Sequence, residues 1–270
     1  MATKFRGTVS PELAWQVGSL LAALVLVHSL YVLVVRPRAE LDLARQEVAR
    51  QENPSHVDER SGWVIIRDFE QESCFVLMLW ALAIMGMKAR ETRGERASLE
   101  QDLVPLAEGS RILPEDAREF ARHVESLPQA ERERLLPRAL PSALHRFTAT
   151  RNIQDVSATA HRHCETESDR LDSELSMVRY IAWAIPSIGF LGTVRGIGVA
   201  LGRAHEAAEG KIGGVTEALG VAFNSTFVAL LISIGLMFLL HQLQLRQDRL
   251  ILDTESYLDR NLIRHLQAAS

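Results

Sequence analysis

Two apolar runs joined by a short loop constrain the fold of this chain more than any other stretch. The first run covers residues 180–202 and the second covers residues 215–240. Each is long enough for a helix that crosses a bilayer with an apolar core about 30 Å thick. Both runs also carry hydroxyls, glycines or ionisable groups, which must find partners in hydrocarbon. The sequence therefore predicts a transmembrane hairpin that lines an ion pathway, with residues 203–214 as its short outer loop.

Two further apolar runs precede this hairpin. Residues 15–35 follow a short N-terminal segment, residues 1–14, and are longer than a signal-peptide core, which indicates a retained transmembrane helix. His28 inside it is either a proton relay or a helix-packing residue. Residues 74–88 form a short span without a polar face, and a buried or interfacial helix is the alternative. The predicted fold class is an all-α membrane protein with about four transmembrane helices, or three as the alternative.

Charged segments separate these runs and set the orientation. Lysines and arginines follow the second and fourth runs and precede the third, which places these flanks in the cytoplasm. Residues 36–73 are then an outer polar segment, and residues 89–179 are a cytoplasmic helical region. Residues 241–270 form a cytoplasmic C-terminal helix, and with four spans residues 1–14 are cytoplasmic too. Long helices are expected to extend from the membrane into a cytoplasmic helical bundle.

Prolines subdivide the cytoplasmic region. Pro114 is expected in the first turn of a helix, where a missing N–H is tolerated. Pro128, Pro137 and Pro141 are expected to divide the following stretch into short helices. A long helix is then predicted to begin near Ser142 and to run directly into the third apolar run.

Composition and side-chain spacing exclude several classes of function. The chain has 270 residues and a net charge of −4, which does not suggest nucleic acid as a partner. Its two cysteines, Cys74 and Cys164, give neither a disulfide framework nor metal-ligand spacing. A metal site at His161, His163, Cys164 and Glu165 is conceivable, but a solvated helix surface explains them more simply. No metal, cofactor or enzymatic nucleophile is predicted.

Small and charged residues in the hairpin have distinct expected roles. Helix packing accounts for the set of Pro186, Gly189, Gly192 and Gly196, because proline removes a backbone hydrogen bond and glycines let helices approach closely. A buried arginine costs roughly 2.5 to 3.5 kcal/mol on insertion scales, so Arg195 needs a partner. Glu217 is the nearest acid in this topology, and an Arg195–Glu217 ion pair is predicted.

Polar residues of the two hairpin helices are expected at one depth. Counted from the middle of the loop, Thr193 lies level with Asn224, Ser225 and Thr226. Hydroxyl and amide groups at one depth can hydrogen-bond water or an ion; hydrogen bonding between the helices is the alternative. No Asp or Glu lies near the middle of the spans, so the acid of a proton path is expected from another polypeptide.

Two motifs in the hairpin resemble those of the MotA/TolQ/ExbB proton-channel family. Residues 186–196 fit the pattern P-x-x-G-x-x-G-T-V-x-G, and residues 214–219 fit G-x-x-E-A-L. The resemblance is strong over about the last third of the chain. It implies that Thr193 is a lumen threonine and that Glu217 serves the ion pathway instead of pairing with Arg195.

The sequence departs from the family pattern at two positions. Ala222 stands where the family usually has a threonine, and Leu231 stands where it usually has a proline. Thr226 lies one turn beyond Ala222 on the same face and can supply the missing hydroxyl. The choice between H⁺ and Na⁺ is therefore open, although the lack of extra hydroxyls in residues 185–201 favours H⁺.

The resemblance also implies an assembly and a function. Members form a homopentamer around a dimer of a single-span MotB/TolR/ExbD-like subunit, whose intramembrane Asp carries protons. The chain is then expected to be a multi-pass proton-conducting stator subunit of the bacterial inner (cytoplasmic) membrane. The alternative is a non-conducting membrane scaffold that organises a partner through its cytoplasmic helices. Outer-membrane transport, envelope maintenance, motility and phage defence all remain open as the process that it powers.

Overall fold

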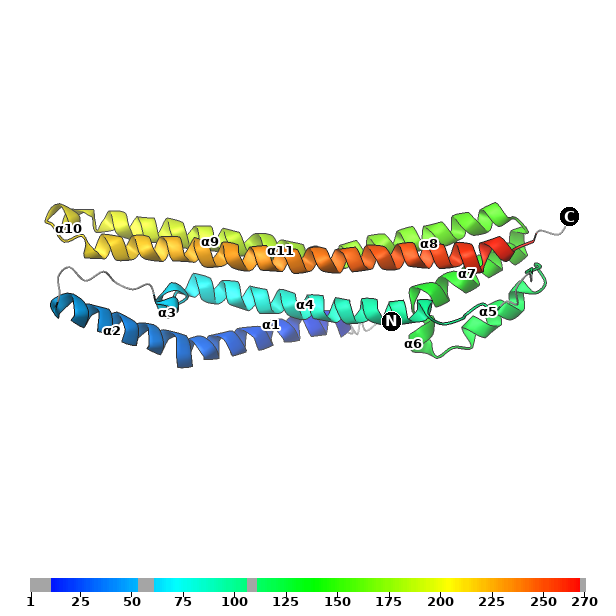
Figure 1. Ribbon diagram of the computed structural model, residues 1–270, viewed down its shortest axis with the longest axis horizontal. Coiled ribbons are helices and arrows are strands. Elements are labelled where there is room, and N and C mark those ends of the chain that lie inside the picture. Colours follow the sequence, from blue (N-terminus) through cyan, green and yellow to red (C-terminus); the bar gives the residue numbers. More distant parts are fainter. Residues whose placement is uncertain (1–10, 53–60, 106–110, 268–270) are drawn as a thin grey trace, which may run out of the picture. The chain divides into compact units, whose positions relative to one another are not determined.

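A computed structural model describes residues 11–52, 61–105 and 111–267 of the protein, and Figure 1 shows its elements. The regular elements in these residues are helices, so the predicted all-α class is confirmed. Four continuous helical stretches are long and apolar enough to cross a membrane: Glu12–Ala49, Phe69–Leu99, Ile153–Gly202 and Gly213–His265. The chain is therefore a multi-pass membrane protein of the predicted four-helix kind.

The chain divides into two compact units, each with its own interior. We call Met1–Met85 together with Met177–Leu240 the apolar unit. We call Gly86–Ser176 together with His241–Ser270 the polar unit. The helices α4 (Phe69–Leu99) and α11 (Gly213–Asn261) each contribute residues to both units.

The first apolar run belongs to a bent helix in the apolar unit (Figure 1). Helix α1 (Pro11–Leu30) continues through a π-helical segment, η1 (Tyr31–Val35), into α2 (Arg36–Glu52). Pro37 explains the π segment, because it lacks an N–H and its ring would clash with the carbonyl one turn earlier. A wider turn relieves this clash, and the N–H of Arg36 accordingly reaches five residues back to the carbonyl of Tyr31.

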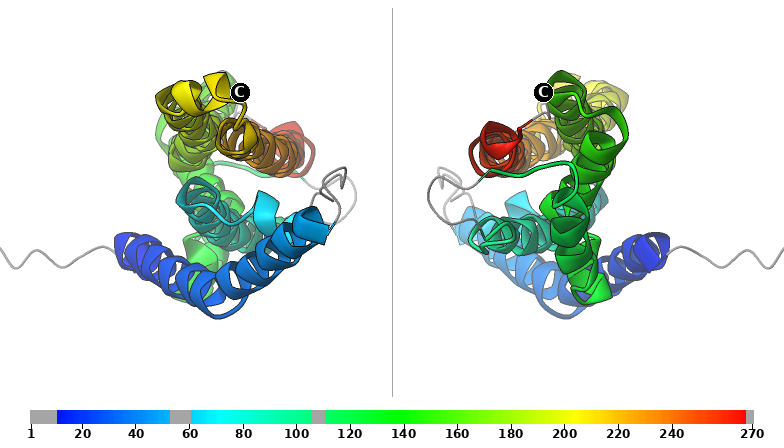
Figure 2. Two further views of the ribbon diagram at one scale, coloured as in Figure 1. Left: turned by 90° about the vertical axis from the view of Figure 1, so that its left-hand side faces the viewer. Right: turned by 90° about the vertical axis from the view of Figure 1, so that its right-hand side faces the viewer.

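Helix α4 lies between the bent helix and the hairpin in the apolar unit, as Figures 1 and 2 show. It follows the one-turn helix α3 (Gly62–Ile65). The indole N–H of Trp80 donates to the carbonyl of Gln16 on α1 at 2.9 Å, and Cys74 Sγ lies 3.7 Å from the carbonyl oxygen of Ile185 on the hairpin. Because α4 begins at Phe69, its first turn consists of residues from the expected outer polar segment.

The hairpin consists of α9 (Ser176–Gly202) and α11, with the short helix α10 (Ala204–Ala208) in its loop. Helix α9 continues through Pro186, which cannot donate a hydrogen bond to the carbonyl of Ala182 four residues earlier. Ser233 on α11 fills this role, since its Oγ donates to that carbonyl at 3.1 Å. The hydroxyl of one helix thus repairs the backbone of the other.

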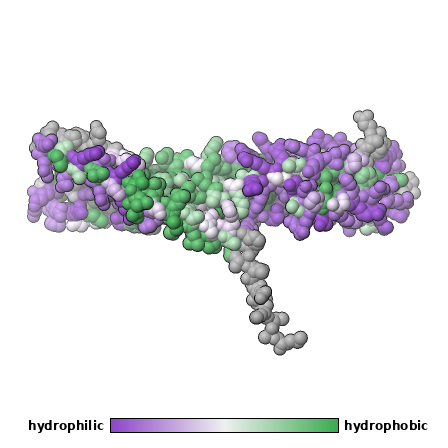
Figure 3. Space-filling view, turned by 90° about the horizontal axis from the view of Figure 1, so that it is seen from below, coloured by the Kyte–Doolittle hydropathy of each residue, from purple (hydrophilic) through white to green (hydrophobic). Residues whose placement is uncertain are grey.

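Large hydrophobic side chains cover the outside of the apolar unit. In the space-filling view they gather over α1, whereas hydrophilic side chains cover α2 (Figure 3). The hairpin helices also expose bulky residues, among them Trp183 and Phe190 on α9 and Phe223 on α11. Exposed apolar area of this extent suits lipid and not water.

The polar unit has an apolar core. Its helices besides the ends of α4 and α11 are α5 (Ala117–Glu125), α6 (Gln129–Arg132), α7 (Leu135–Thr150), α8 (Ile153–Glu174) and η2 (Ile263–His265). Buried leucines, alanines and Phe147 fill the space between them. An isolated bridge between Ile112 and Leu266 ties the end of the described chain to this unit.

Two expectations about the helices of the polar unit were wrong. The expected long helix does not begin near Ser142, because α7 ends at Thr150 and Arg151 adopts a left-handed conformation with φ of 51°. Asn152 then caps α8 by accepting the N–H of Gln154 at 2.9 Å. Nor does Pro141 interrupt α7, which passes through it.

Candidate functional site

Helices α9 and α11 approach closely along a seam of small residues. Each of three glycines on α9 faces a residue of α11: Gly189 faces Ala229, Gly192 faces Ser225, and Gly196 faces Ala222. A Cβ atom at Gly196 would lie 2.7 Å from the Cβ of Ala222 and 2.8 Å from its backbone nitrogen. Glycine is therefore required by the close approach. The same approach leaves little room for a threonine at Ala222.

The hydroxyls of Thr193 on α9 and Thr226 on α11 are hydrogen-bonded to each other within this seam. Thr193 Oγ1 lies 3.0 Å from the carbonyl oxygen of Ala222, and Thr226 Oγ1 lies 3.1 Å from that of Gly189. A hydroxyl has one donor hydrogen and two acceptor lone pairs, so this group of four oxygens keeps acceptor capacity. Both threonines are half-buried, and the group can meet a water molecule or a cation.

The neighbouring belt residues lie differently. Ser225 is buried, and its Oγ donates to the carbonyl of Val221 at 3.0 Å and lies 3.4 Å from Nε2 of Gln71 on α4. Asn224 is half-buried on α11, and its side chain makes no hydrogen bond with the described residues. The structure thus joins Thr193 and Thr226 by an interhelical hydrogen bond, as the packing alternative predicts, and directs Ser225 towards α4.

Arg195 has a different partner from the one predicted. Its Nε and Nη2 donate to both carboxylate oxygens of Glu70 at 2.6 and 2.9 Å, and its guanidinium lies 4.9 Å from the ring centroid of Phe69. The prediction of an Arg195–Glu217 ion pair is therefore wrong. Glu217, whose side chain is 59% exposed, lies 3.9 Å from Arg203 instead. The reason is that α4 begins early enough to carry Glu70 against α9.

A small cavity of about 140 Å³ lies beside this ion pair in the apolar unit. Asp68, just before α4, lines it together with Arg195, Arg203 and Glu217. Burial raises the pKa of the Asp68 carboxyl, and the positive charges of Arg67 and Arg195 act in the opposite direction. The cavity therefore combines charged groups from the residues before α4, from α9 and the residue after it, and from α11.

His28 also contacts α4. Its Nδ1 lies 2.7 Å from one carboxylate oxygen of Glu72, and Arg36 Nη2 donates to the other oxygen at 2.7 Å. Glu72 therefore bridges α4 to the bent helix on either side of the π segment. This contact fits the helix-packing interpretation of His28, because the histidine and Arg36 share one carboxylate.

The residues considered as a metal cluster lie on α8, and its two histidines have different partners on other helices. His161 Nδ1 lies 2.9 Å from Glu255 Oε1 on α11, and His163 Nε2 lies 2.8 Å from the hydroxyl of Ser142 on α7. Burial raises the pKa of the Cys164 thiol to about 11. In the described residues these side chains, with exposed Glu165, do not gather into a metal-binding group.

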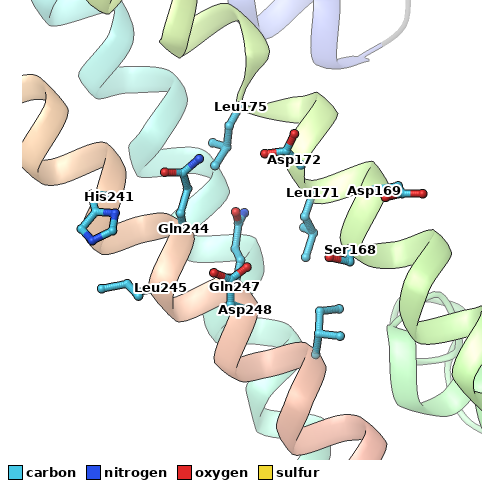
Figure 4. A pocket seen from close by; sticks show the side chains of 11 residues that line it. Ser168, Asp169, Leu171, Asp172, Leu175, His241, Gln244, Leu245, Gln247 and Asp248 are labelled. Atoms are coloured by element: carbon cyan, nitrogen blue, oxygen red, sulfur yellow. The ribbon is translucent and has the colours of Figure 1, made fainter.

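The polar unit contains a larger cavity, of about 450 Å³, between α8 and α11 (Figure 4). Asp169, Asp172 and Asp248 line it, together with the imidazole of His241. Gln247 is 3% exposed, and its Nε2 has no hydrogen-bond partner in the protein. A polar cavity of this size with a buried amide suits ordered water.

Sequence reasoning missed the contribution of α4 to the site. Asp68, Glu70 and Gln71 precede the apolar run and were assigned to the outer polar segment. One signal was present: an arginine inside a span requires an acid, and Glu70 opens the span next to it in the fold. Hydropathy alone counts such a residue as lying outside the membrane.

These features define a class: a membrane protein of four apolar helices in which two small-residue helices carry a pair of hydroxyls. Residues 130–256, which contain the hydroxyl pair, match the model of the MotA/TolQ/ExbB proton channel family. The resemblance found in the sequence is thereby confirmed. No curated protein and no solved structure matched the chain in the same comparisons.

Proposed function

We propose that this chain is the proton-conducting stator subunit of a membrane motor. Five copies form a homopentamer around a dimer of a single-span MotB/TolR/ExbD-like subunit in the bacterial inner membrane. An intramembrane Asp of that partner carries the protons, and their flow is converted into rotation or mechanical work. Each proton that crosses a potential of 100 mV supplies about 2.3 kcal/mol.

The hydroxyl contact between Thr193 and Thr226 carries this proposal. It supplies acceptor oxygens on two adjacent helices of the apolar unit, next to the carbonyls of Gly189 and Ala222. Neutral acceptors stabilise a passing cation without a charge of their own that would hold it. A proton on the partner's Asp therefore finds hydrogen-bonding groups as it moves past α9 and α11.

Thr226 takes the place of the threonine that the family usually has at position 222. Ala222 is fully buried against Gly196, whereas Thr226 is half-buried and reaches Thr193. Glu217 stands nearer the loop and is exposed, so in this proposal it attracts cations to the outer end of α11. The small number of hydroxyls favours H⁺ over Na⁺, which needs more oxygen ligands.

Proton uptake by liposomes that contain the chain and its partner tests the proposal. Thr193→Val and Thr226→Val retain the side-chain volume but remove the hydroxyl, and both are expected to abolish most of the flux. Thr216→Val is the matched control. Thr216 lies on α11, as Thr226 does, and its hydroxyl donates to the carbonyls of Ile212 and Gly213 at the start of that helix. Thr193→Ser is expected to retain flux.

The scaffold alternative predicts a different result. If the wild-type complex carries no protons above the leak of empty liposomes, the motor is excluded and the hydroxyl pair serves helix packing. Flux that survives in both valine variants also contradicts the assigned role of the hydroxyls. Sodium-free and sodium-containing buffers distinguish the two candidate ions in the same assay.

A further inference from the structure

Sequence reasoning placed the acid of the pathway on another polypeptide, but the structure brings a set of acidic and amide side chains of this chain to the hairpin. They come from the start of α4 and the residue before it. Glu70 is 3% exposed and holds Arg195 in a two-point ion pair. Gln71 is fully buried and contacts Ser225 on α11 through Nε2. Asp68 lines the cavity beside them.

Unpartnered oxygen atoms indicate where ordered water is expected in this region. Among the described residues, four buried side-chain atoms have no hydrogen-bond partner in the protein, and Asp68 Oδ2, Gln71 Oε1 and the hydroxyl of Tyr31 are three of them. All three belong to the apolar unit. Buried polar atoms normally bond to protein groups or to ordered water, so water is the expected partner here.

The polar groups lie beside the stretch of α9 that carries Thr193. Asp68 and Glu217 lie in the cavity, and Arg195 lines its wall. The Glu70 partner of Arg195 lies against Gly192, since a Cβ atom there would be 3.1 Å from Glu70 Cγ. Thr193 is the next residue of α9.

We propose that Asp68 is a proton-binding carboxyl of this subunit, which takes up protons from water in the cavity and passes them towards Thr193 and Thr226. A hydronium ion gives its proton to the Asp68 carboxylate, which leaves water and a neutral carboxylic acid. The acid returns the proton to the next water along the path. The Arg195–Glu70 pair fixes α4 against α9 and thereby holds Asp68 beside the hairpin.

The electrostatics around Asp68 suit this role. Burial raises the pKa of its carboxyl, and the negative charges of Glu70 on α4 and Glu217 on α11 act in the same direction. Arg67, 3.9 Å away in the same segment, and Arg195 on α9 lower the pKa. Arg203, at the end of α9, also faces the cavity. A carboxyl with a raised pKa binds and releases protons closer to neutral pH than an exposed one.

The inference rests on the proposed function for its direction of transfer, but proton binding is measurable in the chain alone. Infrared difference spectra of the purified protein in lipid nanodiscs, recorded between acidic and neutral pH, report the C=O band of a protonated carboxyl. We expect one such band to titrate above the exposed carboxyls and to disappear in Asp68→Asn. Glu209→Gln, at a carboxyl that is 65% exposed in the loop, is the matched control and keeps the band.

Proton flux provides the second measurement. In liposomes with the partner, Asp68→Asn is expected to lower flux at least about tenfold, as for loss of a positioned proton-transfer group. Asp68→Glu is expected to restore much of it with a shifted pH dependence, which a purely structural role would not produce. Glu209→Gln leaves flux unchanged.

The two measurements separate the possible failures. If the Asp68→Asn variant conducts protons as fast as the wild type, the inference is overturned and the proposed function stays intact. Absence of a titrating band that depends on Asp68 overturns it as well. If the wild type conducts nothing but the band is present, the proposed function fails and proton binding by Asp68 stands.

Discussion

The two units of the chain differ most in the side chains that they expose. In the polar unit, Phe147 is fully buried among leucines, and the Arg96–Asp253 ion pair lies at the surface, although Glu167 is buried beside Arg138. In the apolar unit, Phe190 is 64% exposed, whereas Glu70 and Gln71 are buried between helices. The same helices α4 and α11 take part in both arrangements.

This difference shows how the surroundings of each unit determine what packs inside. Water drives the apolar side chains of the polar unit together. Hydrocarbon gives no such drive, so the helices of the apolar unit associate through small residues and polar contacts. The glycine seam, the threonine pair and the Arg195–Glu70 pair therefore perform in the apolar unit what the leucine core performs in the polar unit.

Phenylalanine truncation tests the contrast most strongly. Phe147→Ala empties a buried site and is expected to cost about 3–5 kcal/mol of unfolding free energy. Phe190→Ala removes a side chain that faces outward and is expected to cost less than about 1 kcal/mol. Denaturant unfolding of the purified protein in detergent, followed by circular dichroism, measures both. Equal losses of unfolding free energy in the two variants would contradict the contrast between a buried and an outward-facing phenylalanine.

The ion pair of the buried Glu70 with the partly exposed Arg195 gives the next largest effect. Arg195→Leu leaves the Glu70 carboxylate buried without its partner and is expected to destabilise the protein by about 3 kcal/mol. The double variant Arg195→Leu, Glu70→Leu is expected to recover most of this loss, because no charge is stranded. In the polar unit, Arg96→Ala breaks an exposed pair and serves as the control, with an expected cost below about 1 kcal/mol. A double variant as unstable as Arg195→Leu would argue against a stranded charge.

The helix seam predicts an intermediate effect. Gly196→Ala places a methyl group 2.7 Å from the Cβ of Ala222, so the helices must move apart, at a cost of about 1–3 kcal/mol. Gly198→Ala is the control on the same helix, since nothing lies within 4 Å of its added Cβ, and it is expected to be neutral or stabilising. Thermal unfolding of the two variants in detergent distinguishes them. A stable Gly196→Ala protein would show that the seam is loose.

The smallest expected effect concerns pH and the polar unit. Burial lowers the pKa of His163, with Arg138 and Arg162 acting in the same direction, so the unfolded chain binds a proton more readily than the folded one. Stability is therefore lost as the pH falls below the ordinary histidine pKa of about 6.5. His163→Gln is expected to flatten this dependence by less than about 1 kcal/mol, because the ring is only partly buried. Unfolding midpoints between neutral and mildly acidic pH measure it.

Sequence patterns predicted the helices and the common depth of Thr193 and Thr226 for simple geometric reasons. Apolar run length reports bilayer thickness, which accounts for the four helices. Two antiparallel helices with equal rise per residue place positions at equal distances from their loop side by side. Counting from the loop therefore brought Thr193 level with Thr226, and the structure joins their hydroxyls.

The start of α4 and the break before α8 could not be predicted from apolar run length or from distance to a loop. Hydropathy begins the second span at Cys74, but the helix begins at Phe69, where Glu70 finds an arginine that is distant in the sequence. Arg151 adopts a left-handed conformation, for which glycine at that position would have been the usual sequence signal. Asn152 followed by Asp155 did carry a capping signal. Tertiary partners, rather than local preference, decided the first case.

The bond from Ser233 to the carbonyl of Ala182 links two positions on different helices. Pro186 creates the need for a donor, and Ser233 meets it. Among homologous sequences, the presence of proline at the first position should accordingly covary with a small hydroxyl residue at the second. Where the proline is replaced by a residue with its own N–H, the position of Ser233 becomes free to drift to alanine or valine.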